Sequence, residues 1–338
     1  MSEAELIMKR EGQAGTLLMN RPKALNALSL GMIRDFQAAL DAWKHDPAVK
    51  LVILQGAGEK AFCAGGDVRA VREAAIAGDR APVSAFFGEE YAVNQGIAEF
   101  GKPWISLMDG ICMGGGIGLA AHNGPRVVTE KSLLAMPETA IALFPDVGTS
   151  YVLPRLPGQL GTWLALTGAR LRGADGLHTG LATHYVPSAK IAALRTALVE
   201  TGDASVVEQY AETPPPPSFA EHRALIDHAF GQGSMLGIIG ALEAAGTEWA
   251  AEQVKTLRRM SPTSLSVSLE LIRRGATMDL RQCLDEELLL TGRVVHEHPD
   301  FREGVRSVLV DKDGAPQWTP ATLEEVDPAA VQAFFSRG

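Results

Sequence analysis

The sequence predicts an α/β protein, and three observations support this. Apolar runs of strand length recur in the first half of the chain and end at glycine. Two of these runs lead through a glycine-rich turn into a helical pattern, at a spacing of roughly fifty residues. Beyond a run of prolines the pattern is mostly helical. Repeated strand, turn and helix indicate an α/β core with right-handed crossovers.

The first elements follow from local patterns. Residues 5–20, ELIMKREGQAGTLLMN, predict two short strands around a glycine-containing turn. NRPKALNALS (20–29) then reads as a polar loop, and Ser29 is a candidate N-cap. The apolar residues that recur at helical spacing after it are Met32, Ile33, Phe36, Leu40 and Trp43.

The next elements repeat one scheme. KLVILQG (50–56) predicts a buried strand, and AFCAGGDVRAVREAA (61–75) predicts a glycine turn that enters a helix. KPWISLMDG (102–110) and ICMGGGIGLAAH (111–122) predict the same succession again. RVVTEKSLLAM (126–136) is a third short run of this kind. These runs build the α/β core.

Composition divides the rest of the chain. The segment TPPPPS (213–218) can only be extended and semi-rigid. We therefore predict a core over residues 1–205, a proline-rich linker over 206–219 and a mainly helical region over 220–338. Within that last region, SVLV (307–310) reads as a short strand.

The totals exclude several classes of function. The chain has 338 residues, 46% of them hydrophobic and 21% charged, as in an ordinary globular protein. The net charge of −9 and the lack of a long Lys/Arg run argue against nucleic acid as a partner. No apolar run approaches the length that spans a bilayer, so no membrane is expected. The N-terminal residues show no targeting pattern, and we expect a cytoplasmic protein.

The cysteines Cys63, Cys112 and Cys283 are far apart and lack the spacing of metal ligands. Their sparse, odd number fits a reduced compartment. Cys63 and Cys112 lie in apolar, glycine-rich runs, so the simple interpretation is a small buried hydrophobic residue at each position. The sharper alternative is Cys112 as a nucleophile.

Two glycine-rich turns are candidate anion sites. CAGGD (63–67) and MGGGIG (113–118) follow apolar runs and open helices. Glycine lets the backbone approach a ligand closely, and the free N–H groups of a first helical turn favour negative charge. Two such turns can direct two N–H donors at one developing oxyanion. Close helix–strand packing is the simpler alternative. A dinucleotide site is a poorer one, because GGGIG is not a G-x-G-x-x-G motif.

Two carboxylates stand alone in an apolar stretch. Glu138 and Asp146 lie in MPETAIALFPDVG (136–148) among apolar residues, proline and glycine. Charged groups are rarely buried without partners, so the acids either cap or face solvent, or they serve proton transfer in a dry pocket. One hypothesis uses all these features: two backbone donors hold a thioester or similar carbonyl, and the two acids manage protons or water beside it.

The chain resembles the crotonase (enoyl-CoA hydratase/isomerase) superfamily. The motifs that carry the resemblance are NRPKALNALS (20–29), AFCAGGD (61–67), DGICMGGGIGLA (109–120) and MPE (136–138). The resemblance implies a spiral of ββα units with a helical C-terminal region, and an acyl-CoA ligand. It also implies an oxyanion hole formed by the N–H groups of Gly66 and Gly115. Enoyl-CoA hydratases carry a second catalytic Glu at the position of Gly118, and glycine cannot exchange protons.

A narrower branch, the 3-hydroxyisobutyryl-CoA hydrolases, matches better. The segments similar to this branch are FFGEEY (86–91), MPETAIALFPDVG (136–148), LPRLPG (153–158), LALTGARLRGAD (164–175), ATHYV (182–186) and PDFREGVRSVLVDKDGAPQW (299–318). This resemblance implies that Glu138 and Asp146 are catalytic and that Glu90 contacts the substrate through the substrate's hydroxyl group. It implies no metal and no redox cofactor, because CoA belongs to the substrate. It also implies self-association, as a trimer or hexamer.

The function expected from the sequence is hydrolysis of a short branched β-hydroxyacyl-CoA thioester to free acid and CoA. The leading substrate is 3-hydroxyisobutyryl-CoA from valine breakdown. General-base attack and a transient anhydride on Glu138 both stay open. The alternatives are an enoyl-CoA hydratase or isomerase, and a non-catalytic acyl-CoA-binding protein. Gly148-Thr149-Ser150 departs from the hydrolases' more glycine-rich continuation, which bears on the acyl group preferred. Lys60, Arg69 and Lys102 are candidate contacts for the CoA phosphates.

Overall fold

The structure is a computed structural model that describes residues 4–337. Its internal contacts divide the chain into two compact units. Unit 1 comprises the chain up to Gly66, Glu89–Ala135 and Arg170–Ser218. Unit 2 comprises Asp67–Gly88, Met136–Ala169 and the chain from Phe219 onward. The boundary at 88/89 falls within helix α3 (Arg80–Ala98).

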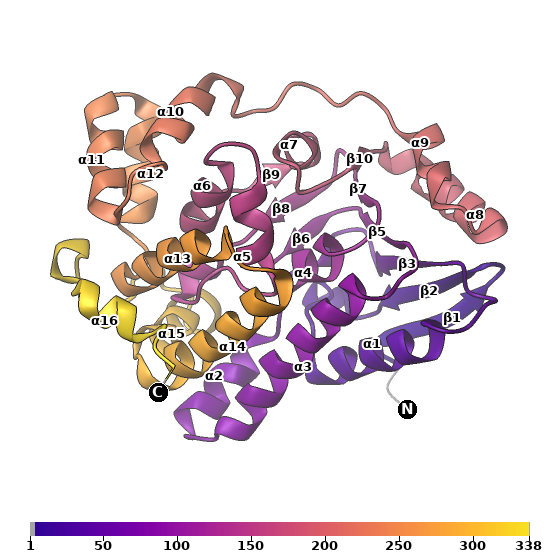
Figure 1. Ribbon diagram of the computed structural model, residues 1–338, viewed down its shortest axis with the longest axis horizontal. Helices are drawn as coiled ribbons and strands as arrows, with labels where there is room; N and C mark the ends of the chain where they lie inside the picture. The colour runs from indigo at the N-terminus through magenta and orange to yellow at the C-terminus, as the bar shows by residue number, and fades with distance from the viewer. Residues whose placement is uncertain (1–3, 338) are drawn as a thin grey trace. The chain divides into compact units, whose positions relative to one another are not determined.

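Unit 1 holds two sheets (Figure 1). The first has the order β1 (Leu6–Glu11), β2 (Ala14–Met19), β3 (Leu51–Gly56), β5 (Trp104–Met108), β7 (Arg126–Val128) and β10 (His184–Tyr185). The second has the order β4 (Ala61–Cys63), β6 (Ile111–Met113), β8 (Leu133–Ala135) and β9 (Leu171–Arg172). Pairing is parallel apart from the β1–β2 hairpin and the β8–β9 pair.

Successive strand pairs build a spiral. In the pairs β3–β4, β5–β6 and β7–β8, the first strand joins the larger sheet and the second joins the smaller one. Each turn of the chain therefore adds one strand to each sheet, which is the ββα spiral that the resemblance implied. The run 126–136, which the sequence presented as one segment, supplies the short strands β7 and β8 to different sheets.

The larger sheet buries one face of its parallel strands against helix α8 (Ile191–Thr201). Side chains such as Ile53, Ile105 and Val127 meet Leu194 and Leu198 there, all at 0% exposure. Burying each such side chain contributes about 1.5–3 kcal/mol, so this interface fixes the positions of the strands and of the turns that follow them. The remaining unit 1 helices are α1 (Leu30–Trp43), α4 (Gly115–Ala121), α7 (Gly173–Thr179) and α9 (Val207–Tyr210).

Helix α1 forms as its sequence predicts. The Ser29 side chain accepts a hydrogen bond from the Met32 N–H, which caps the helix. The residues at helical spacing that are buried on its inner face include Met32, Ile33, Phe36, Leu40 and Trp43. The predicted strands, glycine turns and first helices of the core are thereby confirmed.

The regular elements that lie wholly in unit 2 are helical. Its α-helices are α2 (Val68–Ile76), α5 (Thr149–Val152), α6 (Leu160–Thr167), α10 (Arg223–Ala229), α11 (Met235–Ala245), α12 (Glu248–Leu257), α13 (Pro262–Gly275), α14 (Leu280–Glu297), α15 (Asp300–Val305) and α16 (Pro328–Ala333). Helices α10, α11 and α12 lie side by side (Figure 1). The contact-based division differs from the one drawn along the chain, since it groups 67–88 and 136–169 with the C-terminal helices. The boundaries at 205 and 219 stay predictions.

The predicted strand at SVLV is wrong. Arg306–Val310 forms one turn of π-helix that continues α15. The β-branched Val308 and Val310 are 40% and 47% exposed, so no sheet buries them. Instead Arg306 pairs with Glu303, Asp311 and Asp313, and these contacts hold the segment in a helical turn.

No helix in the described part of the chain is long and apolar enough to cross a membrane.

Candidate active site

The first glycine turn is held by the preceding loop of unit 1. The Leu28 N–H donates to the Gly65 carbonyl at 2.8 Å, and the Ala64 N–H donates to the Leu25 carbonyl at 3.0 Å. Gly65 has a φ of +107°, which excludes a side chain without strain. These contacts fix the backbone on both sides of Gly65 and so set the direction of the next amide, that of Gly66.

Asn26 anchors the loop that holds this turn. The side chain is fully buried, and its amide donates to the Ala57 and Ala61 carbonyls at 2.9 and 2.8 Å. Its Oδ1 accepts from the Arg21 N–H at 3.0 Å. The motif NRPKALNALS therefore has a structural explanation: a buried asparagine joins the loop to strand β4 and its approach.

The second glycine turn opens helix α4. Gly114 has a φ of +49°, and Gly115 is the first helical residue, whose N–H has no partner within the helix. A Cβ built at Gly116 would lie 2.5 Å from the Cys63 carbonyl oxygen, so close packing explains this glycine. Gly115 differs from Gly116, because a Cβ there would meet the side chain of Glu90, a predicted site residue.

Gly66, Gly115 and Glu90 come together in unit 1. A Cβ at Gly115 would lie 3.6 Å from the Gly66 nitrogen and 2.5 Å from Glu90 Oε1. Glu90 is 3% exposed and is carried by α3. Three residues that the sequence marks as site residues thus lie close together, and the Glu90 carboxylate occupies the side of residue 115 toward which a Cβ would point.

Glu138 lies in unit 2 at the start of the 3-10 turn Glu138–Ile141. It is 7% exposed, which excludes the alternative of a surface acid. The Leu143 N–H donates to the Glu138 carbonyl at 3.0 Å, and Ala142 takes a left-handed φ of +55° to close the turn. The neighbouring Phe144 is fully buried. Glu138 is therefore largely removed from solvent, and the dry pocket stays a prediction.

Asp146 lies in unit 2 as well and is 5% exposed. Its carbonyl accepts from the Thr149 N–H at 2.9 Å and from the Thr149 hydroxyl at 2.7 Å. Val147 and Gly148 follow with φ values of +55° and +77°. A left-handed conformation is strained for a β-branched residue, so the surroundings must hold this turn in place.

Sequence reasoning missed Glu287 of helix α14. This side chain is fully buried, and its Oε2 accepts from the Gly148 N–H at 2.8 Å. Burial first, and then the charge of Asp146, raises the pKa of Glu287 to about 8. The signal was present in LDEELLL (284–290), because Glu287 shares the buried face of α14 with Leu284 and Leu290.

Two cysteines and two of the basic candidates have structural surroundings. Cys112 is fully buried, and burial raises its pKa well above the ordinary value, so the nucleophile hypothesis is not supported. Burial likewise raises the pKa of Cys63 to about 12. The Lys102 ammonium donates to the Trp43 and Asp46 carbonyls, and Arg69 donates to the Leu309 carbonyl. These contacts give Lys102 and Arg69 a role in holding backbone.

Comparison with known proteins places this geometry in a family. Residues 14–335 match the family described as enoyl-CoA hydratase/isomerase. A 3-hydroxyisobutyryl-CoA hydrolase of Xenopus tropicalis, named mitochondrial, is 45% identical over 99% of this chain and 90% of its own length. The human protein of the same name is 46% identical over 98% of this chain and 88% of its own length. The resemblance to the hydrolase branch is confirmed.

Two solved structures share the fold. One, titled a carnitinyl-CoA dehydratase from Mycobacterium thermoresistibile, has a TM-score of 0.95 and 41% identity, covering 99% of this chain and 97% of that one. Another, titled an enoyl-CoA hydratase from Rhodobacter sphaeroides 2.4.1, has a TM-score of 0.93 and 39% identity, covering 98% and 97%. The predicted α/β spiral with its helical C-terminal region is confirmed. The chain belongs to the enoyl-CoA hydratase/isomerase, or crotonase, family.

Proposed function

We propose that this protein hydrolyses 3-hydroxyisobutyryl-CoA, a short branched β-hydroxyacyl thioester, to 3-hydroxyisobutyrate and free CoA. The observation that carries the proposal is identity of about 45% with hydrolases of that name along nearly the whole chain. At this level a shared substrate follows if the residues that do the chemistry are present, and Glu90, Gly115, Glu138 and Asp146 all are.

In the proposed reaction the unit 1 amides polarise the thioester. The N–H groups of Gly66 and Gly115 donate to the carbonyl oxygen, whose negative charge grows as the tetrahedral intermediate forms. Glu90 accepts a hydrogen bond from the substrate hydroxyl. The short separation of Glu90 Oε1 from the Cβ position at Gly115 supports this assignment, because a substrate at the amide would meet that carboxylate.

The unit 2 acids perform the proton chemistry. Water adds to the carbonyl carbon, the C–S bond breaks, and the CoA sulfur receives a proton. One carboxylate of Glu138 and Asp146 directs or replaces the attacking water, and the other orients it or protonates the leaving thiolate. Their small exposed fractions of 7% and 5% support this role, since a dry site strengthens each electrostatic interaction.

The alternative on the same fold is an enoyl-CoA hydratase or a dehydratase, as the two solved structures are titled. Moving water across a C=C bond needs a base for the water and an acid for the α-carbon. Gly118 is buried in α4 at the position of the hydratases' second Glu, so that pair lacks one member here. The hydrolase is therefore favoured. A non-catalytic acyl-CoA-binding protein would have no need for two buried acids.

The test follows two signals in purified protein. Release of free thiol from 3-hydroxyisobutyryl-CoA reports hydrolysis, and loss of the enoyl absorbance of crotonyl-CoA reports hydration. We expect rapid thiol release and little change in enoyl absorbance. Loss of the enoyl signal without thiol release would refute the hydrolase, and the absence of both would favour the binding protein.

Two features of the whole protein belong to the proposal. Self-association as a trimer or hexamer rests on the family resemblance, and light scattering of the purified protein measures it. The cytoplasmic location stays a prediction. The similar animal proteins are named mitochondrial, which describes those proteins.

A further inference from the structure

Glu287 makes three hydrogen bonds to one short stretch of unit 2. Its Oε2 accepts from the Gly148 N–H at 2.8 Å, and its Oε1 accepts from the Ser150 N–H at 3.2 Å and from the Ser150 hydroxyl. The side chain is fully buried, and it lies 137 residues further along the chain than Ser150. A residue of the C-terminal helix α14 therefore accepts hydrogen bonds from the backbone shortly after Asp146.

The turn at 146–150, which Glu287 contacts, includes a strained residue, Val147, and the hydrogen bonds that Glu287 accepts help to hold it. Val147 and Gly148 both have left-handed φ values, of +55° and +77°. Such conformations cost about 1–3 kcal/mol each for a non-glycine residue and persist only where the surroundings over-determine them. The Thr149 amide and hydroxyl donate to the Asp146 carbonyl. The amides of Gly148 and Ser150, on either side of Thr149, donate to Glu287. Together these contacts fix the backbone on the C-terminal side of Asp146.

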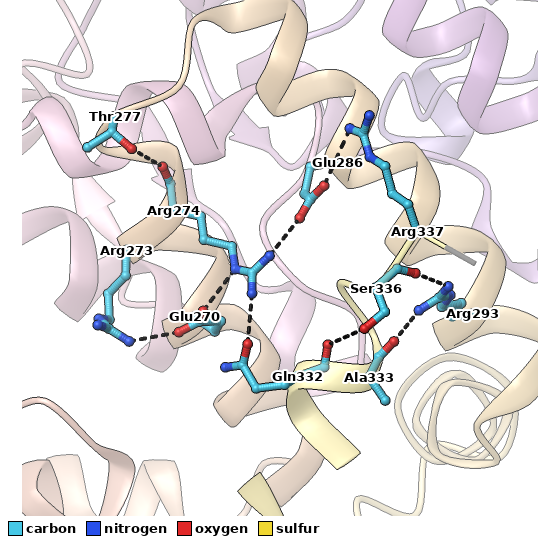
Figure 2. A network of polar contacts seen from close by, with 10 residues as sticks. All are labelled: Glu270, Arg273, Arg274, Thr277, Glu286, Arg293, Gln332, Ala333, Ser336 and Arg337. Carbon is cyan, nitrogen blue, oxygen red and sulfur yellow. Dashed lines mark hydrogen bonds and ion pairs between the residues drawn. The ribbon is translucent and has the colours of Figure 1, made fainter. Parts of the chain in front are cut away.

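The adjacent residue on α14 shows what an ordinary buried acid looks like. Glu286 is 4% exposed, and its oxygens lie 3.2 Å from an Arg274 nitrogen and 3.8 Å from an Arg337 nitrogen (Figure 2). Among the described residues, none of the ion pairs involves Glu287. A buried carboxylate without a cation is costly unless hydrogen bonds or protonation compensate. For Glu287 the compensating hydrogen bonds come from Gly148 and Ser150, in the turn that follows Asp146.

Glu287 and Asp146 are also coupled electrically. The pKa of Glu287 is raised to about 8, by burial first and then by the Asp146 charge, while the hydrogen bonds from Ser150 and Gly148 lower it. The Cys283 thiol, one turn earlier on α14, has its pKa raised to about 11, by burial first; the Ser150 side chain and Arg155 lower it, and Glu287 and Asp279 raise it. The ionised Glu287 carboxylate accepts from the Ser150 hydroxyl. The protonated carboxyl can donate to that same oxygen, so Ser150 accommodates both states.

We propose that Glu287 is a positioning residue for Asp146: its carboxyl group holds the turn 146–150 and its charge state adjusts the field in which Asp146 works. This inference rests on the proposed function, in which Asp146 acts on the thioester. It also gives Ser150 a role in this contact, at a position where the chain departs from the hydrolases' glycine-rich pattern.

The test compares Glu287→Gln with Glu286→Gln, a matched change at the neighbouring buried acid. Both oxygens of Glu287 accept from backbone N–H groups. In Glu287→Gln one oxygen becomes an NH2 group, which cannot accept, so one of the two backbone hydrogen bonds is lost. We expect kcat for thiol release to fall about 10- to 100-fold with KM within about twofold, because a turn misplaced by about 1 Å misaligns a reacting group. Glu286→Gln should keep kcat within about twofold of the wild type.

The pH profile separates positioning from a merely structural role. In the wild type kcat should show an inflection near pH 8, where Glu287 titrates. Glu287→Gln should lack this inflection. Ser150→Ala removes a hydrogen bond that lowers the Glu287 pKa, so it should move the inflection to higher pH. This second variant retains both backbone contacts and reports on the proposal even if Glu287→Gln does not fold.

The outcomes are distinct. A wild type that releases no thiol refutes the proposed function, and the inference falls with it. An active wild type whose kcat and pH profile are unchanged in Glu287→Gln refutes the inference alone. If Glu287→Gln does not fold, an unmoved inflection in Ser150→Ala refutes it. Loss of kcat together with loss of the inflection supports it.

Discussion

At the scale of single residues, the surroundings of each buried carboxylate decide what it can do. Glu286 has arginines beside it and serves the scaffold. Glu287 has backbone amides and a serine hydroxyl, and it holds a turn. Glu138 and Asp146 each begin a tight turn and are nearly fully buried, which suits groups that exchange protons with a substrate. The same side-chain chemistry therefore supports three different roles within one unit.

Replacing Glu138 by glutamine should abolish most of the activity while leaving the fold intact. Glutamine has nearly the same shape but cannot take up or release a proton, and general acid–base catalysis contributes about 10²–10⁴-fold in rate. We expect kcat for thiol release to fall by that factor. The exposed Glu73→Gln is the control and should be unaffected. Full turnover in Glu138→Gln would remove this residue from the mechanism.

Gly115→Ala should displace an oxyanion donor. The new Cβ would lie 2.5 Å from Glu90 Oε1 and 3.0 Å from Leu28 Cδ1, so Glu90 or the turn that carries the Gly115 N–H must move. Alanine keeps the N–H of residue 115 but displaces it; losing one oxyanion donor outright costs about 10²–10³ in kcat, so a fall of up to this size is expected from thiol-release kinetics. Gly240→Ala meets no atom within 4 Å and serves as the control. Comparable activity in the two variants would contradict the assignment.

At the scale of elements, α14 links two parts of unit 2. Glu287 accepts hydrogen bonds from the turn after Asp146, and the preceding residue, Glu286, joins a polar network around the C-terminal helix α16 (Figure 2). In that network Arg274 contacts Glu270, Glu286 and Gln332. Its guanidinium also lies 4.1 Å from the centre of the Phe335 ring. The network gives the end of the chain a fixed place against α13 and α14.

Arg274→Ala should destabilise the protein far more than Arg273→Ala. Removing Arg274 leaves Glu286 buried without its nearest cation, and breaking a buried pair costs about 3–5 kcal/mol. Because the Arg274 side chain is 29% exposed, we expect the loss of unfolding free energy to be about 3 kcal/mol, the lower end of that range. Arg273 is 63% exposed, and its loss should cost less than about 1 kcal/mol. Urea unfolding measures both, and equal losses would show that the network contributes little.

The pH dependence of stability should carry the signature of Glu287. Its folded-state pKa of about 8 exceeds the ordinary 4.5, so folding favours the protonated form. That contribution is fully present below pH 4.5 and is lost as the pH rises through about 8. Glu287→Gln cannot titrate, so its unfolding free energy should decline less over this window than that of the wild type. Parallel curves from urea unfolding would show that Glu287 does not bind this proton.

At the scale of the whole molecule, sequence reasoning succeeded where local rules and apolar periodicity agree. The cap at Ser29, the buried strands and the glycine turns at 63–67 and 113–118 all obey short-range rules. It failed at SVLV, where β-branched residues suggested a strand but ion pairs of Arg306 hold a helical turn. It also missed Glu287, because the partner amides lie 137 and 139 residues away along the chain.

The central claim is that the two acids serve hydrolysis and not the movement of water across a double bond. A single measurement separates these reactions, because 3-hydroxyisobutyryl-CoA is a substrate for both. Mass analysis of the products from the purified protein should show free 3-hydroxyisobutyrate and CoA in equal amounts. Accumulation of the dehydrated enoyl-CoA, with the thioester intact, would contradict the account.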